Sequence, residues 1–167
     1  MGELLTRRAV LAGSALWIGA APGSARAQPA GVRFSGLRVD TAPLVSRGGG
    51  FSASIVRAVM PAKLQTVFGD LVAAGARGLP ILVARIDTIY LPGYGDSREG
   101  NLYALQRDTM SGAGIVLSGR EAQTTTPLNV NLQPGYSGAW YLPDIDARRV
   151  DSLCYQFAYW LRREMQL

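Results

Sequence analysis

The sequence predicts an α+β domain, in which two helices cover one face of a largely antiparallel sheet of about four strands. Three observations predict this class. Apolar and polar residues alternate, as in strands, at 32–40, 81–91, 105–117 and 124–132. Apolar residues recur at helical spacing at about 52–75 and 145–165. The resulting order is β-α-β-β-β-α with no internal repeat, so residues 28–167 are expected to form a single domain.

The first strand is expected to end at Thr41-Ala42-Pro43, and a loop containing Gly48-Gly49-Gly50 follows it. The apolar residues after this loop share one helical face. Pro61 interrupts them, and its missing N–H suits the first turn of a new segment. The sequence therefore predicts two short helices, or one kinked helix, that end at Gly75–Gly78. The glycine loop is expected to be a flexible connection and not an anion site, because it matches no phosphate-loop spacing.

Residues 81–91 carry the strongest strand pattern. Their first half is apolar on both faces, which predicts a central position in the sheet. Alternation places Leu82, Ala84, Ile86 and Tyr90 on one face, and Arg85, Asp87 and Ile89 on the other. We expect Arg85 and Asp87 to form an ion pair on the uncovered side of the sheet. A general acid or base at Asp87 would need a second positioned group, and the sequence identifies none.

The last third of the chain predicts an antiparallel hairpin followed by a helix. A turn at 118–121 joins the two final strands. The closing helix begins at a cap residue, Asp144 or Asp146, and its apolar stripe includes Cys154. We therefore expect a buried structural thiol at this position. Four arginines are expected on the polar faces of this helix: Arg148, Arg149, Arg162 and Arg163.

The first 27 residues have the pattern of an export signal. Thr6-Arg7-Arg8 precedes a short apolar stretch that is rich in Gly and Ala. The run resembles a twin-arginine signal, although Val10 and Ala12 replace the usual Phe and Lys. Ala25-Arg26-Ala27 predicts cleavage near Ala27/Gln28, which makes the mature protein periplasmic and leaves it without a transmembrane span. An N-terminal membrane anchor that is never cleaved is the alternative.

Composition excludes several classes of function. The chain has no histidine and a single cysteine, which removes histidine bases, Ser-His-Asp triads, most zinc sites and internal disulfides. The formal net charge is +5; the signal's three arginines and one glutamate carry +2 of it, which leaves +3 on the mature chain. The remaining arginines are scattered, whereas nucleic-acid sites usually need clustered charge, so no nucleic acid is expected. The sequence contains no recognisable catalytic, metal or cofactor motif.

Two aromatic segments are the candidate binding surfaces. The first is the polar, Gly-rich loop that follows the central strand, and it is longer than a simple connection needs. Its candidate residues are Tyr90, Tyr94, Arg98 and Tyr103. Tyrosine beside glycine and charge is typical of recognition surfaces. The second segment, residues 136–141, offers Trp140 and Tyr141 before the last helix. The alternatives are an ordinary connecting loop for the first segment and aromatic packing across a sheet edge for the second.

Five segments together suggest a family likeness. They are the strand Phe34–Val39, the helix after Gly50, the strand Val83–Asp87, the hairpin after Met110 and the helix from Ala147. In this order the mature chain resembles the small β-α-β-β-α domains of bacterial envelope lipoproteins, namely the auxiliary lipoproteins of ABC-type lipid transport and related outer-membrane assembly lipoproteins. The resemblance implies a non-catalytic protein that docks on partners or lipids. Unlike those proteins, the chain has no cysteine near residue 28, so no lipid anchor is expected at the new N-terminus.

The sequence leaves three classes of function open. We expect a soluble periplasmic accessory or binding module of the cell envelope, which needs no cofactor and whose partner is an envelope protein or a lipid. It would bind through the exposed sheet face and the 92–104 loop. A carrier or sensor of a small apolar ligand or lipid would instead show a lined cavity of some hundreds of Å³. A small exported enzyme would show ionisable groups that converge in a cleft.

Overall fold

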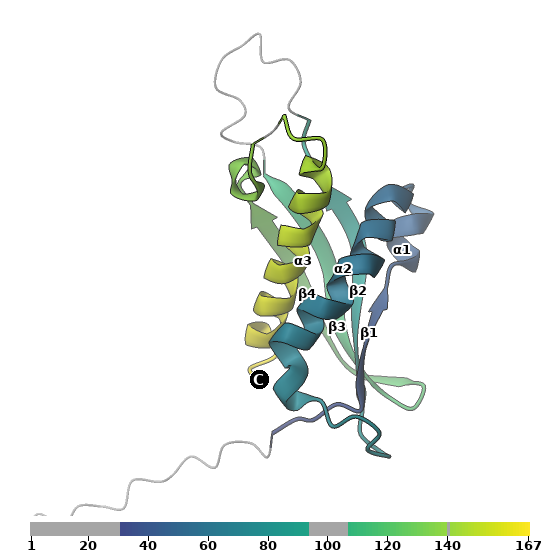
Figure 1. Ribbon diagram of the computed structural model, residues 1–167. Helices are drawn as coiled ribbons and strands as arrows, with labels where there is room; N and C mark the ends of the chain where they lie inside the picture. The colour runs from purple at the N-terminus through teal and green to yellow at the C-terminus, as the bar shows by residue number, and fades with distance from the viewer. Residues whose placement is uncertain (1–30, 94–106, 140) are drawn as a thin grey trace, which may run out of the picture.

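The computed structural model describes residues 31–93, 107–139 and 141–167, which form the α+β fold that the sequence predicts (Figure 1). Four strands make one sheet in the order β1-β2-β3-β4. Their bounds are β1 Gly36–Asp40, β2 Ile81–Tyr90, β3 Asp108–Ser118 and β4 Glu121–Leu132. Each strand overlaps a region of alternating residues, although β1 begins later and β4 begins earlier than the pattern predicts.

The sheet is mixed, and the prediction of a largely antiparallel sheet needs this correction. β1 pairs with β2 in parallel, whereas β2 with β3 and β3 with β4 are antiparallel. The reason is the connection, because the helical segment after β1 carries the chain back along the sheet and β2 then starts at the same end as β1. The predicted β3–β4 hairpin is confirmed, since Ser118 pairs with Glu121 at its turn.

Three α-helices occur in the described residues where the sequence predicts two: α1 Ala42–Ser46, α2 Gly50–Phe68 and α3 Ile145–Glu164. Pro43 lies in the first turn of α1, where the missing N–H of proline is tolerated. Gly48 has a φ of 87° and makes the turn between α1 and α2. Pro61 lies inside α2 on its exposed side and does not divide the helix. Two 3₁₀ turns also occur in the part of the chain that the structure describes, η1 Gly69–Leu71 after α2 and η3 Pro134–Ser137 after β4.

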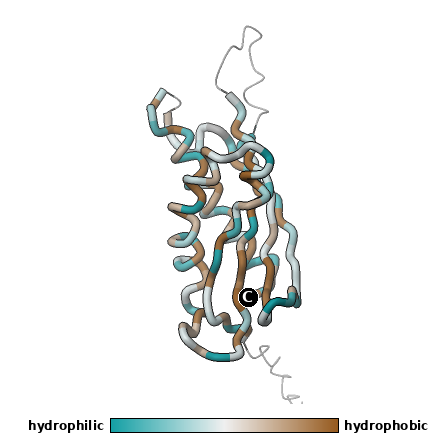
Figure 2. Tube along the Cα trace, turned by 90° about the vertical axis from the view of Figure 1, so that its right-hand side faces the viewer, coloured by the Kyte–Doolittle hydropathy of each residue, from teal (hydrophilic) through white to brown (hydrophobic). Residues whose placement is uncertain are grey.

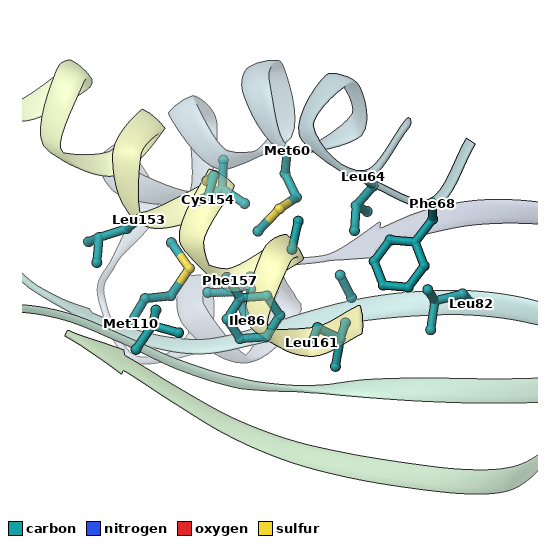
Figure 3. Packing of buried hydrophobic residues seen from close by; sticks show 14 of the residues in the cluster. Met60, Leu64, Phe68, Leu82, Ile86, Met110, Leu153, Cys154, Phe157 and Leu161 are labelled. Atoms are coloured by element: carbon teal, nitrogen blue, oxygen red, sulfur yellow. The ribbon is translucent and has the colours of Figure 1, made fainter. Parts of the chain in front are cut away.

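α2 and α3 lie side by side across one face of the sheet, as the sequence predicts, and no described helix covers the other face (Figures 1 and 2). Apolar side chains of the two layers meet between them (Figure 3). They include Met60, Leu64 and Phe68 from α2, Leu153, Phe157 and Leu161 from α3, and Leu82, Ile86 and Met110 from the sheet. Burial of each such side chain contributes about 1.5–3 kcal/mol, so this layer holds the helices against the sheet.

Cys154 lies in this core, as the sequence predicts, and is fully buried. Burial raises the pKa of its thiol to about 12, so the sulfur stays protonated at neutral pH. A buried, protonated thiol is a poor nucleophile. Cys154 therefore acts as a small apolar side chain.

A β-bulge within β2 changes the faces of this strand. The register with β3 shifts between Ile86 and Thr88. The extra residue inverts the alternation, so Ile89 packs against the core and Tyr90 is 57% exposed. The sequence predicts the opposite faces for these two residues, and the bulge is the physical reason for the error.

Gly112 of β3 lies opposite this bulge and has no room for a side chain. It pairs with Ile86, the last residue before the register shift. A Cβ at this position would lie 2.0 Å from the carbonyl oxygen of Arg85. Glycine therefore lets the two backbones approach closely at the bulge.

Candidate functional site

The predicted binding residues fall into two groups. Tyr94, Arg98, Tyr103 and Trp140 lie outside the described residues. Tyr90 and Tyr141 lie within them and are 57% and 71% exposed. Both are accessible to a partner, and their role in binding stays a prediction.

The predicted ion pair between Arg85 and Asp87 is confirmed. Arg85 Nε donates to Asp87 Oδ1 at 3.0 Å, and Nη2 donates to Oδ2 at 3.4 Å. Beside the pair, the hydroxyls of Thr88 and Ser111 share a hydrogen bond of 2.5 Å. Because the guanidinium engages both carboxylate oxygens, Asp87 serves as a structural group next to the bulge.

Arg149 is buried, and the prediction that it lies on a polar face of the last helix is wrong. Arg149 is 1% exposed, and Asp108 at the start of β3 is fully buried. The guanidinium binds both oxygens of this carboxylate, with Nε 2.9 Å from Oδ2. It also donates to the Pro92 carbonyl at 2.9 Å and to the Asp146 carboxylate at 3.1 Å. These additional hydrogen bonds offset the cost of removing the charges from water.

The Arg149 network joins three parts of the chain at one end of the molecule. Pro92 follows β2 and Asp108 begins β3, and one side chain of α3 binds both. The sequence does contain a signal for this arrangement. Arg149 lies four residues from both Ile145 and Leu153, and therefore on the apolar stripe of the helix.

A shallow groove of about 480 Å³ crosses the N-terminal half of α3 at this end. α2 contributes its apolar residues Ile55 and Val59, and η3 contributes Tyr136 and Ser137. The residues from α3 are Ala147, Arg148, Asp151 and Ser152. We call this surface the α2–α3–η3 groove.

The groove combines an apolar lining with hydroxyl groups. Ser137 Oγ donates to Ser152 Oγ at 3.1 Å, which holds η3 against α3. Tyr136 is 69% exposed beside this contact. A tyrosine side chain offers apolar area and a polar tip together, which is typical of residues that anchor protein interfaces. The groove therefore suits the binding of a partly apolar partner.

The charged residues of the groove are paired. Arg148 Nε lies 2.7 Å from a carboxylate oxygen of Asp144, and Lys63 Nζ lies 2.9 Å from one of Asp151. The hydrogen bond from Arg148 is the main cause that lowers the pKa of Asp144, so this carboxylate is ionised at neutral pH. Within these two pairs each charge already has a partner of opposite sign.

Three further observations describe residues 31–93, 107–139 and 141–167. No three His, Cys, Asp or Glu side chains in these ranges come together as a possible metal site. Each buried side-chain nitrogen or oxygen in the same ranges has a hydrogen-bond partner. None of the helices in this part of the chain is long and apolar enough to cross a membrane.

No protein-family model matches the chain, and no curated protein matches it significantly. Its function is therefore inferred from its own groove, ion pairs and exposed aromatic residues.

Proposed function

We propose that this chain is a periplasmic accessory module of the bacterial envelope, which catalyses no reaction and binds an envelope protein through the α2–α3–η3 groove. The twin-arginine pattern near the N-terminus supports export. The order of helices and strands supports the likeness to the domains of envelope lipoproteins. The groove supports the binding role.

The observation that carries the proposal is an exposed tyrosine on an apolar groove whose neighbouring charges are already paired. Ile55 and Val59 are half-buried, so a partner that covers them gains about 25 cal/mol per Å² of apolar surface. Tyr136, at 69% exposed, has a large area left to bury, as anchoring tyrosines of interfaces do. The paired charges keep their partners on binding, so no isolated charge has to be buried.

Three groups with shifted pKa values are unsuited to acid–base catalysis at neutral pH. An arginine hydrogen bond lowers the pKa of Asp144 and likewise that of Asp70, which binds Arg162. Burial raises the pKa of Cys154 to about 12. General acid–base catalysis favours a group that titrates near the operating pH, and these three groups titrate well away from neutrality.

Affinity capture tests the proposal. The tagged full-length chain is produced in its own cells, purified from periplasmic and membrane fractions, and analysed by mass spectrometry for both proteins and lipids. We expect one envelope protein to co-purify in a fixed ratio. Its recovery should fall about tenfold or more with Tyr136→Ser, because truncation of an anchoring tyrosine costs about 2 kcal/mol.

Tyr159→Ser is the matched control, since Tyr159 is 45% exposed on α3 and does not line the groove. An equal loss of the partner in both variants would contradict binding at the groove. A co-purifying lipid or small molecule without a protein would replace the accessory role with that of a carrier. Substrate turnover by the purified chain would overturn the non-catalytic role.

A further inference from the structure

β1 is an edge strand whose sequence does not block further pairing. β2 is its only sheet partner in the described part of the chain. The opposite edge strand, β4, carries Pro127, which cannot donate a hydrogen bond to an added strand. β1 contains no proline, so each of its N–H groups can donate, and its charged residues Arg38 and Asp40 restrict which strands can pair with it.

Just before β1, residues 71–73 of the chain already pair with this edge. The N–H of Phe34 donates to the Leu71 carbonyl at 2.9 Å, and the carbonyl of Phe34 accepts a hydrogen bond from the N–H of Ala73 at 2.9 Å. The segment then leaves the edge through a turn, in which Ala76 N–H donates to the Ala73 carbonyl at 3.1 Å. Beyond this turn, no described strand pairs with the outer edge of β1.

The backbone groups of Leu37 and Val39 face this edge. In a strand of L-residues, the face that a side chain takes determines the edge to which the N–H and C=O of the same residue point. Phe34 has its side chain in the core and its backbone groups on the outer edge. Leu37 and Val39 pack against the same core, so their backbone groups point to the same edge. Arg38 alternates with them and turns its groups toward β2.

A second groove, of about 460 Å³, runs between β1 and α2. Its apolar lining includes Leu37, Val39, Pro61, Leu64, Val72 and Ala74. Leu37 and Val39 are half-buried, so an apolar side chain from an added strand would complete their burial. The same two residues thus offer both main-chain and side-chain contacts. We call this surface the β1–α2 groove.

Two arginines without a carboxylate partner among the described residues lie beside β1, one on its outer face and one at the β1–α2 groove. Arg57 lines it and donates Nε to Thr41 Oγ1 at 2.9 Å, which positions the guanidinium. Arg38 is exposed on the opposite face of β1. The nearby Asp40 carboxylate accepts the N–H of Ala42 at 2.9 Å. The surface is therefore complementary to a strand that carries negative charge.

We propose that the β1–α2 groove binds an extended acidic segment of a partner protein, which pairs as a fifth strand with Leu37 and Val39. Apolar side chains of the segment enter the groove, and the carboxylates that alternate with them lie on the opposite face of the sheet, beside Arg38. In this mode of recognition the main-chain hydrogen bonds supply affinity and the side chains supply selectivity. The surface is separate from the α2–α3–η3 groove, so either site can fail its test while the other passes.

Hydrogen–deuterium exchange with a synthetic peptide tests this site. The probe is a decapeptide of alternating valine and glutamate, and the comparison peptide has lysine in place of glutamate. We expect the amides of Leu37 and Val39 to exchange about tenfold more slowly, or slower still, with the glutamate peptide. The amide of Arg38, which faces β2, is the internal control and should not change.

Charge reversal separates recognition from folding. Arg38→Glu should weaken binding of the glutamate peptide about three- to tenfold, because it replaces an attraction with a repulsion. Arg120→Glu makes the same charge change at an exposed position in the turn between β3 and β4 and should leave the affinity unchanged. Fluorescence anisotropy of the labelled peptide measures the affinity of both variants, and unchanged exchange of the β2 amides shows that the sheet stays folded.

Any of three results would overturn the proposal. The first is unchanged exchange at Leu37 and Val39 with millimolar glutamate peptide. The second is equal protection by the lysine peptide. The third is protection in the peptide-free protein that rises with protein concentration, which would assign the edge to a second copy of this chain.

Discussion

Replacement of Arg149 by methionine tests whether the buried ion pair holds α3 to the sheet. The change removes a guanidinium that is 1% exposed and leaves the fully buried carboxylate of Asp108 without its cation. The Pro92 carbonyl loses its donor as well. An uncompensated buried charge costs about 3–5 kcal/mol, a large part of the ~5–15 kcal/mol by which folded domains are stable.

Urea unfolding followed by tryptophan fluorescence measures this loss. With an m-value of about 2 kcal/mol/M, the midpoint of Arg149→Met should fall by about 2 M. Arg148→Met is the matched control, because the Arg148 side chain is 52% exposed in its pair with Asp144. Loss of an exposed pair of this kind should leave the midpoint nearly unchanged.

A double variant distinguishes charge from packing. Arg149→Met combined with Asp108→Leu removes both charges, so it should be more stable than Arg149→Met alone. The reasoning is refuted if Arg149→Met loses less than about 1 kcal/mol. A double variant that is less stable than the single one would refute it equally.

Three further predictions concern stability. Gly112→Ala should cost about 3 kcal/mol or more, because its Cβ would lie 2.0 Å from a backbone oxygen of β2. Gly114→Ala should cost less in the same urea titration, because its Cβ would meet only a leucine side chain of α3, and equal losses would contradict this. The pKa of Cys154 is raised to about 12, so stability should fall as the pH rises from ~8.5 toward that value, because the unfolded thiol ionises first. A thiol reagent such as Ellman's should accordingly react with Cys154 only on unfolding, and rapid labelling of the folded chain would count against burial. Hydrogen bonds from Arg162 lower the pKa of Asp70 in the folded protein below its pKa in the unfolded chain. The pair therefore stabilises the fold at pH values above the pKa of the unfolded chain, and this contribution is lost as the pH falls through the pKa of the folded protein. In Asp70→Asn the urea midpoint should therefore fall less steeply as the pH is lowered. Parallel curves of midpoint against pH for the variant and the wild type would show that the pair contributes nothing.

The positions of β2 and α3 could be predicted because each element buries one continuous face. The run 81–86 is short, mostly apolar and rich in β-branched residues, which indicates a buried strand, and the stripe from Val150 to Leu161 has the period of a helix. The β3–β4 hairpin was predictable for the same reason, together with the turn chemistry at Ser118-Gly119. Patterns of this kind depend only on neighbouring residues, so no tertiary information was needed.

Proline and the β-bulge mark where local pattern fails. Proline is unfavourable in the interior of a helix but is tolerated in the first turn. The sequence around Pro43 is therefore compatible with the end of a strand or with the start of a helix. Pro61 lies inside α2, whose other side contributes Met60 and Leu64 to the core. Packing of that face can outweigh one missing hydrogen bond. The bulge after Ile86 depends on a glycine of the neighbouring strand, which the sequence of β2 does not contain.

The candidate site was predictable only in part. The aromatic segment 136–141 contains one aromatic residue of the α2–α3–η3 groove, Tyr136, and the role of this segment in binding stays a prediction. The contribution of Ile55 and Val59 depends on how α2 packs beside α3, and helical periodicity alone does not fix that. The charge of Arg149 predicts a polar face and its position on the apolar stripe predicts burial, and the buried ion pair with Asp108 is what makes burial possible.

Site-specific photo-crosslinking in intact cells tests the binding role most directly. A photoreactive phenylalanine analogue replaces Tyr136 in one strain and Tyr159 in another, and the full-length chain is recovered after irradiation. We expect one envelope protein to be crosslinked from position 136 and not from position 159. Absence of a crosslink at position 136, or the same crosslinked proteins from both positions, would contradict binding through the α2–α3–η3 groove.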